Sequence, residues 1–584
     1  MPADQSTKRH GSRFIVIVAM LSASLALAQT PQAPQTPAPP PTLRVTTHLV
    51  LVDVVVTDKQ GKAVPNLHAD DFIVEENGKQ QKIASISSPA EKPPAPPELP
   101  PGIYSNKPQY RSPGGPITLM LLDALNTPFT DQAYARRQML EFVKEQFKPG
   151  DRMAVFALTG GLSVMQDFTS DPQTLYSALQ RYNPQTQAFA DSNRPLTSVS
   201  NNPSAGNAVS SLDPSTAPFT DNSASATLRG GQAAVAIANA QAALQAFEGA
   251  QVGYAQDQRA VMTLNALNSI ARILGGLPGR KNLIWVTGDL PFSFIPEDRA
   301  MSQEEIEEAQ SGINTRRVAQ HAAGTLAEQF RQAHAEEIRE VAARLASAQV
   351  AVYPVDARGL SISTNIDSQE TMRDMARETG GRAYVNQNEI KVGVERAFAD
   401  ESAAYTIAYY PENKKYDGKY RSIKVKVKSG GVEIQHRHGY YAIDPTQMKG
   451  YNPQQEVAAA LGDAAPATMV SFMAQVKPPA TNSVPGKLGV TFLVDASTLT
   501  AEDAGGGKHM NAVFYATIFS PTGKRVADNT QRVDQTFDAN TYQQILQKGM
   551  VLHMDMDPQP GQIRLAVQDA RTGLVGTIIA PAPK

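Results

Sequence analysis

A short run of oxygen-bearing side chains follows the most apolar stretch of the chain. Ile117 to Leu122 is almost free of polar atoms, Asp123 comes directly after it, and Asn126 and Thr127 follow a few residues later. Such a stretch is typical of a strand buried on both faces of a parallel sheet. In open α/β sheets, ligand sites lie outside the carboxyl ends of the strands. The pattern therefore predicts a ligand-binding turn at Asp123, built from one carboxylate and neutral oxygens.

The same residues also have a plainer interpretation. Asp, Asn and Thr side chains often accept hydrogen bonds from backbone N–H groups at turns and at helix starts. Under this interpretation, Asp123, Asn126 and Thr127 only shape the turn between a strand and the next helix. Asp289 and Asp356, which follow or end two later strands, are likewise expected to be turn residues.

The composition excludes several classes of site. The 584 residues include no cysteine, which excludes disulfides, Cys-ligated zinc, thiol nucleophiles and iron–sulfur clusters. The histidines show no His-x-x-x-His spacing, so no zinc site is predicted. A Gly-x-Ser-x-Gly elbow is also missing. The net charge of −2 argues against nucleic acid as a partner.

The beginning of the chain has the pattern of a signal peptide. Basic residues between Lys8 and Arg13 precede the apolar run Phe14–Ala28, which ends in the small residues of Ala26-Leu27-Ala28. This run is shorter than the roughly 20 residues that a membrane-spanning helix needs. We therefore expect a bacterial protein exported to the periplasm or beyond, which begins near Gln29 and has no integral membrane segment. An uncleaved N-terminal anchor is the alternative.

Strand and helix patterns alternate from Ile117 to Ser402, which predicts a doubly wound, Rossmann-like α/β domain. The further strands are expected at Arg152–Leu158, Leu162–Phe168 (along the sheet edge), Lys281–Asp289, Val350–Asp356 and Arg382–Val385. The helices are expected at Asp131–Phe147, Asp171–Tyr182, Gln232–Leu277, Gln303–Ala348, Ser368–Glu378 and Glu389–Ser402. Residues 183–227 are rich in Ser, Asn and Pro and are expected to be a low-complexity insertion.

Short β runs with glycine turns flank this domain. The runs in 43–88 are too few to enclose a core alone, so we expect them to pair with those in 405–442. A third group, Pro466–Pro581, should form a separate antiparallel β-sandwich. The predicted division is a signal peptide at 1–28, a Pro-rich linker at 29–42, a β unit at 43–88, a linker at 89–116, the α/β domain at 117–402, a β unit at 403–445, a linker at 446–465 and a β-sandwich at 466–581.

Several short motifs occur in an informative order. They are Val54–Lys62, Leu121-Leu-Asp123, Pro278–Lys281, Thr379-Gly-Gly381, Tyr409-Tyr-Pro411 and His438–Tyr441. Each motif alone is weak, but the series resembles the von Willebrand factor A (VWFA)-related proteins of Acidobacteria. The resemblance covers roughly residues 43–442. It implies a von Willebrand A-type domain flanked by β-sandwich domains.

The resemblance also implies a metal site. A domains of this family bind protein ligands through one divalent cation, held by an Asp-x-Ser-x-Ser loop and by a Thr and an Asp from other loops. A single Asp with hydroxyls suffices for Mg²⁺, which keeps several waters. The implied ligands of Mg²⁺ or another divalent cation are Asp123, Thr127, Asn126, Asp289 and Thr263. Leu125 stands where the middle hydroxyl belongs, so the site departs from the family pattern and is degenerate.

Three functions follow from these observations. The first is an exported, non-catalytic binding or adhesion protein whose α/β domain docks a protein or cell-surface partner. The second is a structural envelope or assembly protein in which the Asp123 loop binds no metal. The third is enzymatic, because Asp123-x-x-x-Thr127 also resembles the Asp-x-Asp-x-Thr motif of haloacid-dehalogenase phosphatases, whose first Asp is a nucleophile. Leu125 removes the acid of that motif, so we expect the first function and no enzyme.

Overall fold

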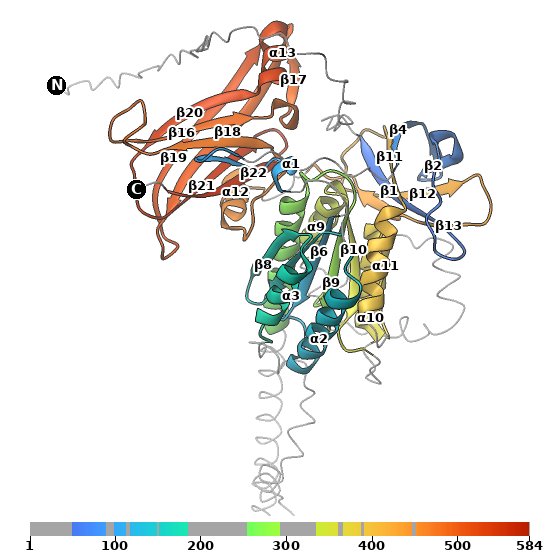
Figure 1. Ribbon diagram of the computed structural model, residues 1–584. Helices are drawn as coiled ribbons and strands as arrows, with labels where there is room; N and C mark the ends of the chain where they lie inside the picture. The colour runs from blue at the N-terminus through green and yellow to red at the C-terminus, as the bar shows by residue number, and fades with distance from the viewer. Residues whose placement is uncertain are drawn as a thin grey trace, which may run out of the picture. The chain divides into compact units, whose positions relative to one another are not determined.

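The computed structural model describes residues 49–88, 99–111, 117–148, 151–184, 254–292, 334–359, 366–386, 390–444, 446 and 451–582 (Figure 1). The expected signal peptide, the Pro-rich linker and nearly all of the 183–227 insertion lie outside these residues. The described residues form a mixed α/β structure of sheets and helices. None of their helices is long and apolar enough to cross a membrane.

The apolar stretch that ends at Asp123 forms the middle strand of a five-stranded sheet with the order β10-β9-β6-β7-β8. Its strands are β6 (Ile117–Asp123), β7 (Met153–Leu158), β8 (Leu162–Thr169), β9 (Lys281–Thr287) and β10 (Val350–Asp356). β6 runs parallel to β7 and β9, β10 runs parallel to β9, and β8 is antiparallel at the edge. Every residue of β6, β7, β9 and β10 is buried, as a sheet covered on both faces requires.

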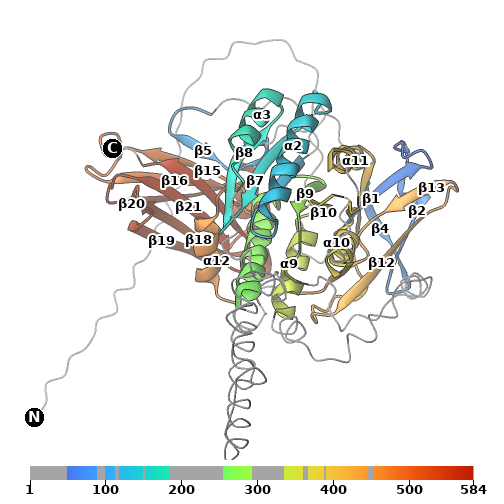
Figure 2. The ribbon, with the colours of Figure 1, turned by 90° about the horizontal axis from the view of Figure 1, so that it is seen from below.

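Helices supply that cover on both faces (Figure 2). On one face, the core includes side chains of α2 (Phe129–Glu145), α3 (Pro172–Arg181) and α11 (Ile390–Ser402). On the other face, it includes side chains of a helix at 254–274, α9 (Ala335–Ser347) and α10 (Ile366–Thr379). The four parallel strands therefore present only their ends to the surroundings, while the edge strand β8 is partly exposed.

The strand predicted at Arg382–Val385 is wrong as a full strand. Only a single parallel bridge forms there, between Tyr384 and Val355. The Tyr384 N–H donates to the Pro354 carbonyl at 2.8 Å, and the Asp356 N–H donates to the Tyr384 carbonyl at 2.9 Å. Asn386 then adopts a φ of 56°, a left-handed conformation that ends the extended run.

The segments before and after the α/β region interleave in two four-stranded sheets, ordered β13-β1-β11-β4 and β14-β12-β2-β3. β1 (Val50–Asp58) pairs with β11 (Ala404–Tyr409), and β2 (Phe72–Glu76) pairs with β12 (Tyr420–Val427). The other strands are β3 (Lys79–Gln81), β4 (Ile83–Ser87), β13 (Val432–Gln435) and β14 (Gly439–Tyr441), and a short 3-10 helix, η1 (Ala69–Asp71), precedes β2. Valines from β1 pack with Phe72, Tyr405 and Tyr409 in one core. We call this part the N-terminal β unit.

The C-terminal β unit also consists of two sheets. One has the order β20-β16-β15-β5, and the other has the order β17-β18-β21-β22 with β19 on the free side of β18. The bounds are β5 Ile103–Ser105, β15 Phe472–Lys477, β16 Leu488–Val494, β17 Ala501–Ala504, β18 Gly507–Phe519, β19 Arg525–Phe537, β20 Met550–Met556, β21 Gln562–Asp569 and β22 Val575–Pro581. Short helices are α1 (Pro108–Arg111), η5 (Ala496–Thr498), α12 (Pro453–Gly462) and α13 (Ala539–Lys548).

Two predicted linkers are wrong in part, because they contain elements of this unit. β5 lies in the 89–116 linker and pairs with β15; three residues are too few to show a strand period. α12 lies in the 446–465 linker. Its start carries clear signals, since the Asn452 side chain accepts from the N–H groups of Gln454 and Gln455 and Pro453 is the first helical residue. Val457, Ala460 and Leu461 then pack on β21 and β22.

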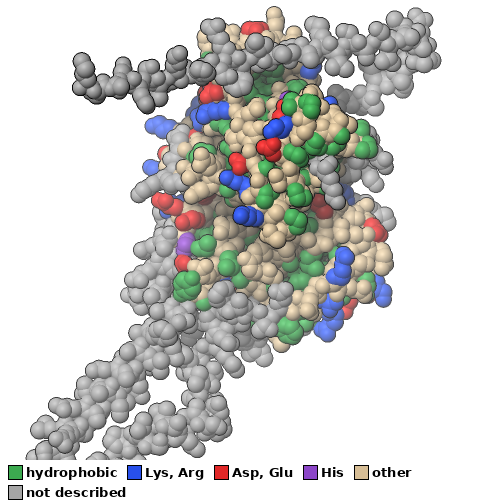
Figure 3. Space-filling view, turned by 90° about the vertical axis from the view of Figure 1, so that its left-hand side faces the viewer, with side chains coloured by type: hydrophobic (Ala, Val, Ile, Leu, Met, Phe, Trp, Pro, Cys, Tyr) green, Lys and Arg blue, Asp and Glu red, His purple; other side chains and the backbone are tan. Residues whose placement is uncertain are grey.

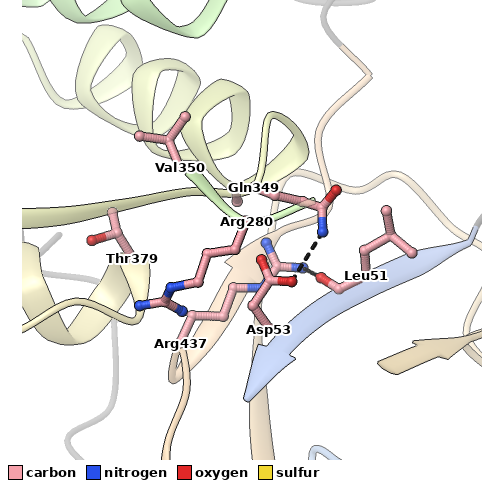
Figure 4. Close-up of a pocket in the computed structure, with 8 residues that line it drawn as sticks. Leu51, Asp53, Arg280, Gln349, Val350, Thr379 and Arg437 are labelled. Carbon is pink, nitrogen blue, oxygen red and sulfur yellow. Dashed lines mark hydrogen bonds between the residues drawn. The ribbon is translucent and has the colours of Figure 1, made fainter. Parts of the chain in front are cut away.

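Polar contacts attach the N-terminal β unit to the α/β region (Figure 4). The Gln349 Nε2 donates to Asp53 Oδ1 at 3.0 Å across this boundary, and the Arg437 Nη2 donates to the Leu51 carbonyl at 2.7 Å within the β unit. Both contacts border a void of about 10 Å³, which the buried Arg280 also lines. Arg280 donates to the Gly380 carbonyl and to the Tyr353 hydroxyl. The attachment thus includes a fixed hydrogen bond between the two regions.

A partly buried histidine, His436, should make the N-terminal β unit sensitive to acid. His436 Nε2 accepts from the Val425 N–H at 3.2 Å, while its Nδ1 lies 2.7 Å from the Arg437 carbonyl and so carries the proton. Burial lowers the pKa of His436, the hydrogen bond to the Arg437 carbonyl opposes that change, and the charges of Arg437 and Lys424 add to the lowering. His438 faces it with ring centroids 6.2 Å apart. The neutral form is therefore the one that the fold holds.

We expect the thermal midpoint of this unit to fall as the pH drops from about 7.5 to about 5.5. The unfolded chain takes up a proton at His436 below about pH 6.5, whereas the folded chain resists it. The contribution of neutral His436 to the stability of the fold is thus complete above that pH. It is lost as the pH falls toward the lower pKa that His436 has in the folded state. His436→Gln should flatten the dependence in calorimetric scans. An unchanged pH slope in that variant would contradict the assignment.

Candidate functional site

Asp123 lies at the carboxyl end of β6 and is 2% exposed. Its Oδ1 accepts a hydrogen bond from the Asn126 N–H at 2.9 Å. Its Oδ2 lies 2.9 Å from each of three donors, which are the Asn126 Nδ2, the Trp285 Nε1 and the Thr287 Oγ1. Both carboxylate oxygens are therefore satisfied by this chain.

The register of the parallel sheet explains why these groups meet. Leu121 lies opposite Trp285 on β9, and side chains two residues apart along a strand point to the same face. Asp123 and Thr287 thus continue the row that Leu121 and Trp285 begin. Burial raises the pKa of Asp123, and the hydrogen bonds from Asn126, Thr287 and Trp285 oppose that rise.

Asn126, Thr127 and Thr263 extend the same network. The Asn126 Nδ2 also donates to Thr263 Oγ1 at 3.0 Å, and the Thr263 hydroxyl donates to the Arg259 carbonyl of its own helix at 2.7 Å. The Thr127 Oγ1 accepts from the Gly288 N–H at 2.9 Å. The loop after β6 is thereby bonded both to the helix at 254–274 and to the loop after β9. All three side chains are buried.

The two other acidic residues at the strand ends have partners of their own. Asp289 Oδ1 accepts from the Leu290 N–H at 2.9 Å, and its Oδ2 lies 4.0 Å from the Arg259 guanidinium. Asp356 accepts from the Arg358 N–H at 3.0 Å and from Nε and Nη2 of the same arginine at 2.8 Å each. Asp356 therefore acts as a turn residue with a bidentate ion pair.

A divalent cation would find few free ligands in this arrangement. The buried Asn126 Oδ1 accepts no hydrogen bond from the described residues, and Leu125 packs in the apolar core instead of facing the loop. The void beside Asp123 and Thr127 measures about 10 Å³, roughly the space of one water. Mg²⁺ needs near-octahedral oxygen ligands. The residues as they lie do not fit that ion; the metal assignment stays a prediction that a titration tests.

Sequence reasoning named Asp123, Asn126 and Thr263, which lie together, but missed the two donors from β9. Trp285 and Thr287 bind the carboxylate through a register that a single sequence does not reveal. A signal was nevertheless present, because Trp285 is the sole tryptophan of the chain and lies two residues before Thr287 at a strand end. Arg259, the partner of Asp289, was hidden in a helical pattern.

Comparisons with known proteins found structural likeness only. No family model matches the sequence, and no curated protein matches it. One similar solved structure is an aerotolerance-related membrane protein from Bacteroides fragilis, with 11% identity, a TM-score of 0.22, and coverage of 49% of this chain and 98% of that chain. Another is a von Willebrand factor type A protein from Catenulispora acidiphila, with 10% identity, a TM-score of 0.22, and coverage of 68% of this chain and 82% of that chain.

Proposed function

We propose that this chain is an exported, non-catalytic binding protein whose α/β region is a doubly wound domain of the von Willebrand A type, flanked by β-sandwiches. The rim at the carboxyl ends of β6, β9 and β10 docks a protein partner without a metal ion. The observation that carries the proposal is the Asp123 carboxylate, whose two oxygens lie 2.9 Å from four donor atoms of this chain. A carboxylate engaged in this way fixes the shape of the rim.

An exposed aromatic side chain stands next to this fixed loop. Phe129 is the first residue of α2, follows Thr127 by two positions and is 52% exposed. Pro128 and Thr130 on either side of it are exposed as well. Aromatic side chains that a rigid scaffold presents are frequent centres of protein interfaces. We therefore place the partner contact at Phe129 and assign Asp123 the task of holding the loop.

Capture of partners from an envelope extract tests this function. The immobilised chain should retain the same partner with and without a chelator, and Phe129→Ser should lose it. Val551→Ser is the matched control, because Val551 is 64% exposed in the C-terminal β unit. Release of the partner by the chelator would favour the metal-dependent alternative. Failure to retain any partner would favour the structural envelope function.

The sole tryptophan permits a direct test of metal binding. Because the Trp285 N–H donates to Asp123, an ion that takes Asp123 as a ligand must alter that bond. We expect Mg²⁺, Mn²⁺ and Ca²⁺ to leave the Trp285 emission unchanged, with no heat of binding in calorimetric titration. A saturable spectral change with any of these ions, lost in Asp123→Asn, would overturn the metal-free proposal.

A further inference from the structure

A second surface, far in sequence from Asp123, combines exposed aromatic rings with lysines. The loop from Tyr410 to Lys419 joins β11 to β12 in the N-terminal β unit. Tyr410 is 47% exposed and Tyr416 is 46% exposed. The exposed lysines nearby are Lys82, Lys414, Lys415 and Lys419. We call these two tyrosines and four lysines the tyrosine–lysine patch.

Strand pairing places Lys82 in this patch. Tyr409 lies opposite Ile83 in the antiparallel pair of β11 and β4, so the next residue of each strand, Tyr410 and Lys82, begins the loop side by side. The Glu412 N–H also donates to Gln81 Oε1 at 3.3 Å. The two chain segments therefore form one surface, although they lie more than 300 residues apart in the sequence.

The loop is held rigid from beneath. Arg421 is 3% exposed and donates to the carbonyls of Asn413 and Lys415. The Gly418 N–H donates to the Ala442 carbonyl at 2.9 Å, and the Lys419 carbonyl accepts from the Ala442 N–H at 3.0 Å. A loop ordered before binding loses less conformational entropy when a ligand arrives. These hydrogen bonds indicate an ordered surface rather than a flexible connecting loop.

The charge of the patch is opposite to that of the chain. The loop carries three lysines and two acids, Glu412 and Asp417, and Lys82 adds a fourth lysine. Asp417 Oδ1 lies 4.0 Å from the buried Arg421. The chain as a whole carries a net charge of −2, and Figure 3 shows another face on which acidic and basic side chains are mixed. An excess of ammonium groups at one place attracts anionic ligands.

The types of side chain narrow the class of ligand. Lysine is a point charge on a flexible stem, which suits carboxylates spread along a polymer, whereas bidentate phosphate recognition relies on arginine. The loop itself contains no arginine, and Arg421 of β12 beneath it is buried. Membrane insertion needs Trp, Phe or Leu at the tip, and this tip carries tyrosines. The electron-rich face of an exposed phenol ring can instead stack on the C–H face of a sugar.

We propose that the tyrosine–lysine patch is a docking surface for an acidic polysaccharide, a sugar polymer that carries carboxylates. The two phenol rings contact sugar rings, and the lysines pair with the carboxylates of successive units. This surface belongs to the N-terminal β unit and is independent of Asp123 and Phe129. Its test therefore does not depend on the function proposed for the rim.

Binding of polygalacturonate to the full mature chain tests this inference by calorimetry and affinity electrophoresis. We expect saturable binding that weakens with added salt, with no binding to neutral dextran. The double variant Lys414→Gln, Lys415→Gln should bind about tenfold more weakly, because each exposed pair contributes a fraction of 1 kcal/mol to about 1 kcal/mol. Tyr416→Ala should also weaken binding, at an unchanged thermal midpoint.

A matched double variant serves as the control. Lys524→Gln, Lys548→Gln removes the same charge from exposed positions in the C-terminal β unit and should bind as the natural chain does. Equal losses in both double variants would overturn the proposal, because net charge and not the patch would then explain binding. Binding to dextran as tight as to polygalacturonate would also overturn it, as would a preference for vesicles of anionic phosphatidylglycerol.

Discussion

Replacing Asp123 by alanine is expected to lower the free energy of unfolding of the α/β region by about 3 kcal/mol. The substitution leaves the Asn126 N–H, the Asn126 amide and the Trp285 N–H buried without their acceptor. Each such donor costs about 1–3 kcal/mol, and local relaxation recovers part of the sum. Denaturant unfolding followed by Trp285 emission measures the loss where it arises, because the chain has one tryptophan.

Asp123→Asn provides the graded control. One oxygen remains to accept hydrogen bonds, but the new amide N–H₂ faces a donor, so the loss should be about half as large, near 1.5 kcal/mol. The Trp285 emission should shift in the same order, from the natural chain through Asn to Ala. Natural stability in both variants, together with a response to divalent ions that only the natural chain shows, would instead identify Asp123 as a cation ligand.

Removing Arg272 is expected to cost about 3 kcal/mol, because it leaves the buried carboxylate of Asp463 without its ion-pair partner. Arg272 extends from the helix at 254–274 and bonds Asp463 Oδ2 through Nε at 2.8 Å and Oδ1 through Nη2 at 2.9 Å. Its Nη1 lies 3.3 Å from Glu456 of α12, which Arg344 of α9 also holds at 2.6 Å. In Arg272→Met, calorimetry and proteolysis within α12 should both report a looser attachment of α12 to the helix at 254–274.

A double variant separates the lost ion pair from lost packing. Arg272→Met, Asp463→Leu replaces both charges with apolar groups and should recover most of the stability, because buried pairs stabilise little over an apolar equivalent. Arg532→Met removes an exposed pair with Asp534 at 3.1 Å and should have no measurable effect. Equal instability of the single and double variants would show that the apolar stem of Arg272, and not its charge, matters.

Acid should weaken the same attachment. Burial acts to raise the pKa of Glu456, but the hydrogen bonds and charges of Arg344 and Arg272 outweigh it, so the pKa is lowered. A carboxyl with a lowered pKa contributes stability that is complete above its unfolded value of about 4.3. That contribution is lost as the pH falls through the lower folded value. Proteolysis within α12 should therefore accelerate below about pH 4.

The sequence pattern predicts the positions of helices and strands better than it predicts which residues contact one another. The apolar run Ile117–Leu122 predicts β6 because burial on both faces leaves no room for polar side chains. Three residues of β5 show no period, and the pattern therefore missed that strand. The partners of Asp123 could not be predicted, because they depend on the alignment of β9 beside β6. The resemblance implied that Thr263 lies near Asp123. In the structure, Asn126 links the two residues, because its Nδ2 donates to both of their side chains.

The pairing of β1 with β11 constrains the order in which the chain acquires structure. Asp53 and Thr406 bond across that pair at 2.6 Å and are 353 residues apart. During synthesis, almost the entire α/β region is made after β1 and before β11, so the valines of β1 stay unpaired over that interval. Contacts between residues this far apart in the sequence slow folding. Unpaired β-branched strands are prone to aggregate in that interval. A truncated chain that ends before Ala404 would leave β1 in this state permanently.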